Sequence, residues 1–173
     1  MPLDMRALAS RIAIAGAVVA VLDGIFAVAL YVSILHLTTP ARLFQSIAGA
    51  LLGKAAFQGG AATVLLGLAI HCTVALSWSA VYAALWSALR PLRELTASPR
   101  GVALAGAVFG MIVWLAMDLV VLPLTQARPT PVTSPFFIVM LLWHAIGVGL
   151  PMAALIRAPL ASPAAMKLTH ADN

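Results

Sequence analysis

Charged residues are scarce in this 173-residue chain, which contains ten Lys and Arg and five Asp and Glu. They make up 9% of the sequence, whereas hydrophobic residues make up 63%. A soluble domain carries about 25% charged residues, so the composition predicts an integral membrane protein that is embedded in a lipid bilayer. The net charge of +5 does not indicate nucleic-acid binding, because the basic residues lie between apolar runs rather than on one face.

Cysteine is almost absent, and Cys72 is the single example. An internal disulfide and the CxxC and CxxCH motifs are therefore excluded. The chain also lacks HExxH, GxSxG and an arginine cluster for phosphate, which excludes the familiar signatures of zinc proteases and hydrolases. An enzyme that acts on a lipid or quinone, with His and Asp as general base and orienting group, stays an alternative, although the sequence favours a protein that is not an enzyme.

Long apolar runs are abundant, and four of them are long enough to cross a bilayer, which takes about 20 residues. The predicted spans cover about residues 12–35, 60–89, 101–122 and 136–156. Together they predict an all-α fold, a polytopic membrane four-helix bundle that forms a single transmembrane domain over residues 1–157. The polar tail, residues 158–173, is predicted to be flexible. The first run is interrupted by Asp23 and exceeds the apolar region of a signal peptide, usually about 7–15 residues, so we interpret it as a retained span.

A short helix is predicted over residues 41–57, between the first two spans, after Pro40 ends the preceding helix. Leu43 and Phe44 lie on its apolar side, while Arg42 and Lys54 make the segment too polar, as well as too short, for a span. We interpret it as an interfacial or re-entrant helix. An ordinary amphipathic connecting helix is the alternative.

Positive charges are distributed unequally between the two sets of connections. One set comprises the N-terminus, the loop near residues 90–100 and the tail. It holds seven basic residues: Arg6, Arg11, Arg90, Arg93, Arg100, Arg157 and Lys167. The other set holds three: Arg42, Lys54 and Arg128. Because cytoplasmic loops carry the excess of Lys and Arg, both termini are predicted to be cytoplasmic.

Small residues recur at helical spacing in every span, a pattern that allows membrane helices to approach closely. The predicted packing positions are Gly16, Gly49, Gly53, Gly67, Gly106, Gly110 and Gly147, with Pro151 expected to kink the last span.

Each span also carries one ionisable residue inside its apolar run: Asp23, His71, Asp118 and His144. At about 1.5 Å per helical residue, all four fall near or beyond the midplane, in the outer half of the bilayer. Each lies on the face of its helix that carries small residues, so the sequence predicts that the four side chains point into one interior. Ionisable residues within a membrane are costly and mark candidate functional sites.

Three functions are compatible with this set of residues. The first is translocation of a small solute, a proton or another ion, for which four helices enclose little volume, so that a homo-oligomer is expected. The second is a structural or accessory role in which the polar residues only specify helix pairing, at about 0.6 kcal/mol per hydrogen bond. The third is a haem or metal site that uses His71 and His144 as ligands, with or without the two aspartates. The sequence specifies no cofactor.

Several short motifs resemble a family of small bacterial four-helix inner-membrane proteins to which no activity is assigned. They are Pro40 with QSIAGALLG (Gln45–Gly53), GLAIH (Gly67–His71), MDLVVLPL (Met117–Leu124) and GVGLP (Gly147–Pro151). The resemblance extends over most of residues 12–157. It implies a protein of the bacterial inner membrane and implies no activity, cofactor or catalytic residue.

Overall fold

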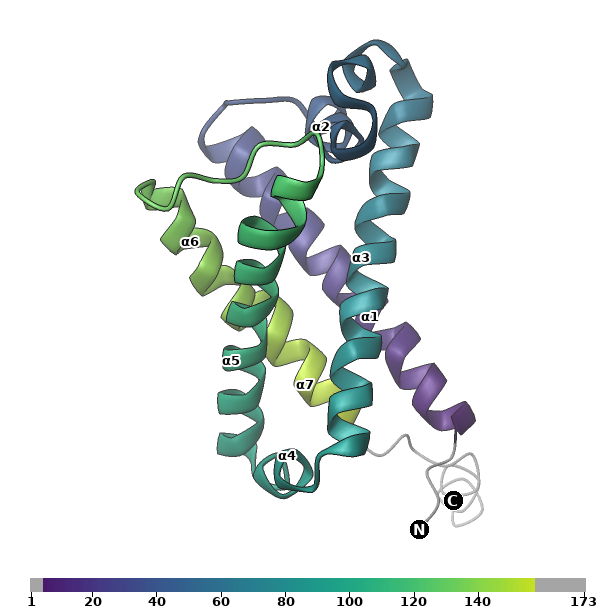
Figure 1. Ribbon diagram of the computed structural model, residues 1–173, viewed down its shortest axis with the longest axis vertical. Helices are drawn as coiled ribbons and strands as arrows, with labels where there is room; N and C mark the ends of the chain where they lie inside the picture. The colour runs from purple at the N-terminus through teal and green to yellow at the C-terminus, as the bar shows by residue number, and fades with distance from the viewer. Residues whose placement is uncertain (1–4, 158–173) are drawn as a thin grey trace, which may run out of the picture.

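The computed structural model describes residues 5–157, and this part of the chain is helical and contains no strand. Four of its helices are long and apolar enough to cross a membrane: Met5–Ile34, Gly60–Ala88, Pro99–Leu124 and Pro135–Arg157. These agree with the four predicted spans, whereas the predicted tail at residues 158–173 lies outside the described residues. Three elements lie at one end of the molecule in Figure 1: the beginning of α1 (Met5–Ala27), the short helix α4 (Arg90–Leu95) and the end of α7 (Leu150–Arg157). We call this the α4 end and the opposite one, where α2 lies, the α2 end.

The first helix is longer at its N-terminal side than predicted. Helix α1 spans Met5–Ala27 and continues as a π-helical segment, η1, over Val28–Ile34. The predicted start at residue 12 is wrong because the basic lead is itself helical. Within it, Arg11 Nη1 donates a hydrogen bond over 3.1 Å to the carbonyl of Ile156, near the end of the last helix.

The predicted helix over residues 41–57 consists of two segments, α2 (Pro40–Leu52) and the 3₁₀ segment η2 (Gly53–Gln58). Thr39 caps α2 by accepting a hydrogen bond from the amide of Arg42. The helix ends because Gly53 adopts φ +56°, a left-handed conformation that glycine tolerates. Helix α2 packs on α3 (Gly60–Ala88), and Gln45 Nε2 donates to Thr63 Oγ1 over 3.2 Å between them.

The polar loop predicted near residues 90–100 contains one further short helix, α4 (Arg90–Leu95). Thr96, which follows it, is buried and joins three segments at the α4 end. Its hydroxyl accepts from Trp86 Nε1 over 3.0 Å, and its carbonyl accepts from Arg157 Nη1 over 3.0 Å. These bonds hold α4 against the ends of α3 and the last helix.

The last two long helices each change their hydrogen-bonding pattern near a proline. Helix α5 (Pro99–Ala116) continues through a π segment, η3 (Met117–Val121), and a 3₁₀ turn, η4 (Leu122–Leu124), which contains Pro123. The fourth helix consists of α6 (Pro135–Trp143), a π segment, η5 (His144–Gly149), and α7 (Leu150–Arg157). Pro123 and Pro151 lack an amide hydrogen and crowd the preceding turn, and in both helices the π segment lies in that turn.

Glycines allow direct backbone contact at some of the predicted positions. An added Cβ at Gly110 would meet the carbonyl of His144, and one at Gly106 would lie 2.8 Å from the carbonyl of Gly149. Gly149 itself meets the backbone of Gly106 and Gly110, a contact that the sequence analysis did not identify. Helix α5 and segment η5 therefore pack backbone to backbone.

The other predicted glycines differ in their contacts. Gly16 faces Leu76 between α1 and α3, and Gly67 faces the carbonyl of Phe44 between α3 and α2. Gly49 and Gly147 show no such contact with a neighbouring helix at their added Cβ. An added Cβ at Gly49 would meet no atom within 4 Å in the described part of the chain, and one at Gly147 would meet the indole of Trp143 in its own helix.

Candidate functional site

Asp118 is the most deeply buried ionisable side chain that the sequence analysis singled out. It lies in the π segment η3 and is 0% exposed. Its Oδ1 accepts a hydrogen bond over 2.9 Å from the backbone amide of Thr130, in the connection between η4 and α6. Its Oδ2 is buried and has no hydrogen-bond partner among residues 5–157. Such an orphaned oxygen is uncommon, because buried polar atoms are normally hydrogen-bonded.

One helical turn before Asp118, the indole of Trp114 lies against His144. The two ring centroids are 4.9 Å apart, and Trp114 Nε1 is a second buried polar atom without a partner in the described residues. His144 Nδ1 lies 2.8 Å from the carbonyl of Met140, which can only accept, so Nδ1 carries the hydrogen. In the neutral ring, Nε2 is therefore the nitrogen that can accept a proton.

Asp23 reaches the same region from the first helix. Its Oδ1 accepts a hydrogen bond over 2.8 Å from Trp143 Nε1, and the Trp143 indole stacks on Phe26 with ring centroids 3.9 Å apart. The carboxyl group also lies within electrostatic range of His144. Asp23 and His144, on the first and fourth spans, therefore share one neighbourhood.

Tyr31 lies near enough to both carboxyl groups to be influenced by their charge. It lies in the π segment η1 and is within electrostatic range of both Asp23 and Asp118. We use the term polar cluster for Asp23, Tyr31, Asp118 and His144. Its members come from three different spans.

Three of the four members of the polar cluster lie in π-helical segments. Tyr31 is in η1, Asp118 is in η3 and His144 begins η5. A π turn adds one residue to the helical repeat and rotates the following side chains, and such turns are frequently found at functional sites. The local backbone irregularities of three helices thus coincide with the polar cluster.

His71 does not join the polar cluster in this way. Its Nε2 lies 2.9 Å from the carbonyl of Ala20, on the face of α1 that packs on α3, and its ring approaches Phe44 of α2. Around it is an open groove of about 840 Å³ with a mainly apolar lining that includes Gly16, Gly24 and Leu68. The convergence of all four ionisable side chains on one interior stays a prediction. His71 is bound to the backbone of the neighbouring helix.

The structure gives no support to a metal site built from the predicted residues. Within residues 5–157, no three or more His, Cys, Asp or Glu side chains come together as possible ligands of an ion. His71 Nε2 and His144 Nδ1 each face a backbone carbonyl, and these contacts engage one nitrogen of each proposed haem ligand.

The sequence analysis missed three contributors to this region. Tyr31 was not considered, because a tyrosine in an apolar run is usually a packing or interface residue. Trp114 and Trp143 were likewise not singled out, although Trp143 donates a hydrogen bond to Asp23. The one available signal was the position of Trp143 directly before His144. The sequence does not indicate that Thr130 binds Asp118, because the donor is a backbone amide rather than a side chain.

Comparisons of the chain with protein-family models, with curated proteins and with solved structures find no match.

Proposed function

We propose that this chain is a multi-pass membrane protein that binds and translocates protons through the polar cluster. Asp118 is the proton-binding group, and Tyr31, Asp23 and His144 form the hydrogen-bonding route that continues from it. The observation that carries the proposal is the buried Asp118 Oδ2, which is unpartnered within the described residues while Oδ1 is held by Thr130.

The proposal follows from the cost of charge in an apolar interior. An isolated carboxylate is strongly disfavoured there unless it is paired or neutralised. The only hydrogen bond to Asp118 recorded in residues 5–157 comes from the neutral amide of Thr130. Binding a proton neutralises the group, and releasing it creates a charge that the surroundings stabilise poorly. In this proposal Asp118 therefore passes its proton only to a neighbouring acceptor.

A proton fits the polar cluster better than a metal ion does. Metal ions in proteins require several oxygen or nitrogen ligands at short distance, and the described residues hold no group of three candidate ligands. A proton requires only hydrogen-bonding groups in sequence. The tyrosine hydroxyl and the imidazole can each accept and donate one.

The orientation belongs to the same proposal. The basic residues at the α4 end favour a cytoplasmic location for that end. Asp118 and the connection between η4 and α6, which contains Thr130, would then lie towards the outside of a bacterial inner membrane. Helix α2 then lies at the outer surface as an interfacial helix. Its exposed Arg42, whose guanidinium lies 5.9 Å from the ring centroid of Phe57, is better suited to the head-group region than to a re-entrant position. The enclosed volume of four helices favours a homo-oligomer.

Proteoliposomes that contain the purified protein and an internal pH dye provide the test. With a potassium–valinomycin potential as driving force, the wild type should acidify or alkalinise the lumen according to the sign of the potential. Asp118→Asn should abolish the protein-dependent flux, because the amide cannot release a proton. Ser33→Ala, an exposed change on the first helix, is a matched control and should keep the flux. Equal fluxes for wild type, Asp118→Asn and empty liposomes would contradict the proposal.

Two hydrogen bonds between helices favour a second function, a purely structural role for the polar residues. The Asp23–Trp143 and His71–Ala20 hydrogen bonds each join two helices, as expected if the polar residues only specify helix pairing. In that case one variant is informative, in which alanine replaces all four residues: Asp23, His71, Asp118 and His144. It should differ from the wild type in stability and should not differ in proton flux. Loss of flux in Asp118→Asn with unchanged stability would favour the proton route.

A further inference from the structure

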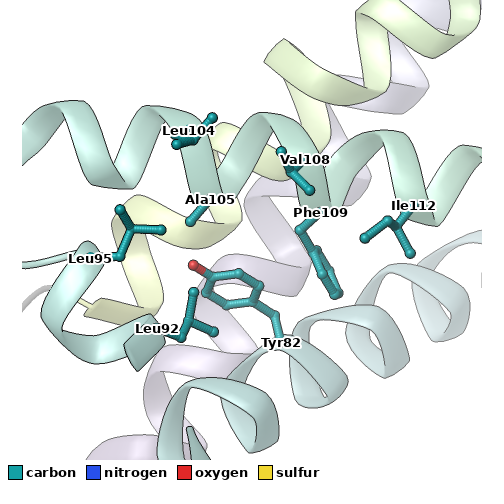
Figure 2. A pocket seen from close by; sticks show the side chains of 8 residues that line it. All are labelled: Tyr82, Leu92, Leu95, Leu104, Ala105, Val108, Phe109 and Ile112. Atoms are coloured by element: carbon teal, nitrogen blue, oxygen red, sulfur yellow. The ribbon is translucent and has the colours of Figure 1, made fainter. Parts of the chain in front are cut away.

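Another buried polar atom without a hydrogen-bond partner among residues 5–157 lies at the α4 end, away from the polar cluster. A cavity of about 350 Å³ opens there between α3, α4 and α5, comparable with ligand pockets, which are roughly 300–1,000 Å³. Its lining is almost wholly apolar. Figure 2 shows the side chains that form it, among them Tyr82, Leu92, Leu95, Leu104, Ala105 and Phe109.

Tyr82 is the one lining residue with a polar side-chain atom. The residue is 1% exposed, and its ring packs edge-on against Phe109 with centroids 4.9 Å apart. In Figure 2 the hydroxyl of Tyr82 points towards Leu95 and Ala105, into the cavity. This hydroxyl has no hydrogen-bond partner in the part of the chain that the structure describes. A buried hydroxyl normally has one, so its direction indicates a ligand that accepts a hydrogen bond.

A positively charged residue lies on the same helix as part of the cavity lining, close to it in sequence. Arg100 is exposed and precedes Leu104 and Val108 by four and eight residues on α5, so the three residues share one face of the helix. The other nearby arginines are engaged: Arg90 pairs with Glu94, and Arg93 donates to the carbonyls of Trp86 and Ser87. Within residues 5–157, the Arg100 side chain has no hydrogen bond or ion pair, so no described residue engages its guanidinium.

We propose that this cavity is a binding site for one anionic phospholipid. An acyl chain fills the apolar space, Tyr82 donates a hydrogen bond to an ester carbonyl, and Arg100 binds the phosphate. The spacing is suitable, since Ala105 lies five positions after Arg100, about 7.5 Å along the helix. Leu104, Val108 and Ile112 are 57%, 42% and 49% exposed on the outer face of an apolar span, so the cavity opens where lipid chains would lie. Basic pockets between membrane helices are suited to acidic head groups.

Native mass spectrometry of the purified protein, mixed with equal amounts of dioleoylphosphatidylglycerol and dioleoylphosphatidylcholine, tests this assignment. The wild type should retain one phosphatidylglycerol in preference to phosphatidylcholine. Tyr82→Phe, which removes only the hydroxyl, should weaken retention of both lipids about two- to tenfold, as expected for one hydrogen bond. Arg100→Gln should remove most of the preference for the anionic lipid.

Two further variants keep the result interpretable. Arg128→Gln removes an exposed arginine at the opposite end and should leave both the retention and the preference unchanged. Val108→Trp should fill the mouth of the cavity and displace the lipid without altering Tyr82, and an unchanged melting temperature should show that each variant folds. Equal retention of the two lipids by the wild type, or equal effects of Arg100→Gln and Arg128→Gln, would overturn the assignment. The assignment would also be overturned if the wild type formed a dimer without bound lipid and Val108→Trp disrupted that dimer.

Discussion

The backbone amide of Thr130 donates a hydrogen bond to Asp118 Oδ1 over 2.9 Å, and this bond ties the connection between the third and fourth spans to the buried acid. The same connection is attached to α2 through Gln126, whose side chain donates to the carbonyl of Leu51 over 2.7 Å. This connection is therefore fixed at two points, one on α2 and one on the proposed proton-binding group. A change in the charge of Asp118 alters the acceptor strength at one of them.

Removing the Thr130 amide should destabilise the protein. Thr130→Pro eliminates the donor and leaves Asp118 without its hydrogen bond, at a cost of about 1–3 kcal/mol in the free energy of unfolding. Thr130→Ala keeps the amide and should cost much less. Unfolding in mixed micelles would measure both. In an Asp118→Ala background the proline substitution should cost less than in the wild type, because the two residues interact. An equal cost in the two backgrounds would mean that the bond contributes nothing.

The indole nitrogen of Trp143 should have a measurable but modest effect on stability. Trp143→Phe removes the donor to Asp23 and retains an aromatic ring next to Phe26. We expect a loss of about 0.6 kcal/mol, the average for a hydrogen bond between membrane helices, together with the loss of part of the stacking area. Trp78→Phe, at a tryptophan that packs edge-on against Phe109, is the matched control. If the proton flux falls in Trp143→Phe and not in Trp78→Phe, the orientation of Asp23 is required for transfer.

Two glycine substitutions should have opposite effects. In Gly110→Ala the new Cβ would overlap the carbonyl of His144, so α5 and η5 must separate, and overpacking of this kind costs about 1–3 kcal/mol. In Gly49→Ala the new methyl group meets open space within the described chain. Alanine is preferred over glycine in helices by up to about 1 kcal/mol, so this variant should be neutral or slightly stabilised. Thermal unfolding of the two variants side by side would check the prediction, and equal melting temperatures would contradict it.

Hydropathy predicted the positions of the four long helices because apolar length is a property of each segment alone. The π segments were not predictable in the same way. Pro151 predicted a kink in the last span, but no proline lies within η1, and that segment became visible only in the structure. Likewise, the small-residue face identified which side of α1 carries Asp23 and could not show that His71 would bond to the carbonyl of Ala20. Partners of that kind depend on how two helices cross.

The position of His71 outside the polar cluster leads to a further prediction. His71→Leu removes the contact with the Ala20 carbonyl and should reduce stability by about 1 kcal/mol, while the proton flux in proteoliposomes persists. His144→Leu should reduce the flux, because it removes an acceptor at the end of the proposed route. If the two variants lose flux to the same extent, all four ionisable residues act together, as the sequence analysis predicted.

The protonation of Asp118 tests the central claim most directly. Infrared difference spectroscopy of the reconstituted protein, recorded as the pH is changed and repeated in D₂O, detects the carbonyl stretch of a protonated carboxylic acid. The account predicts such a band in the wild type and in Asp23→Asn, shifted by deuterium and missing in Asp118→Asn. An identical spectrum in the wild type and in Asp118→Asn would show that Asp118 does not bind the proton, and the proposed route would be wrong.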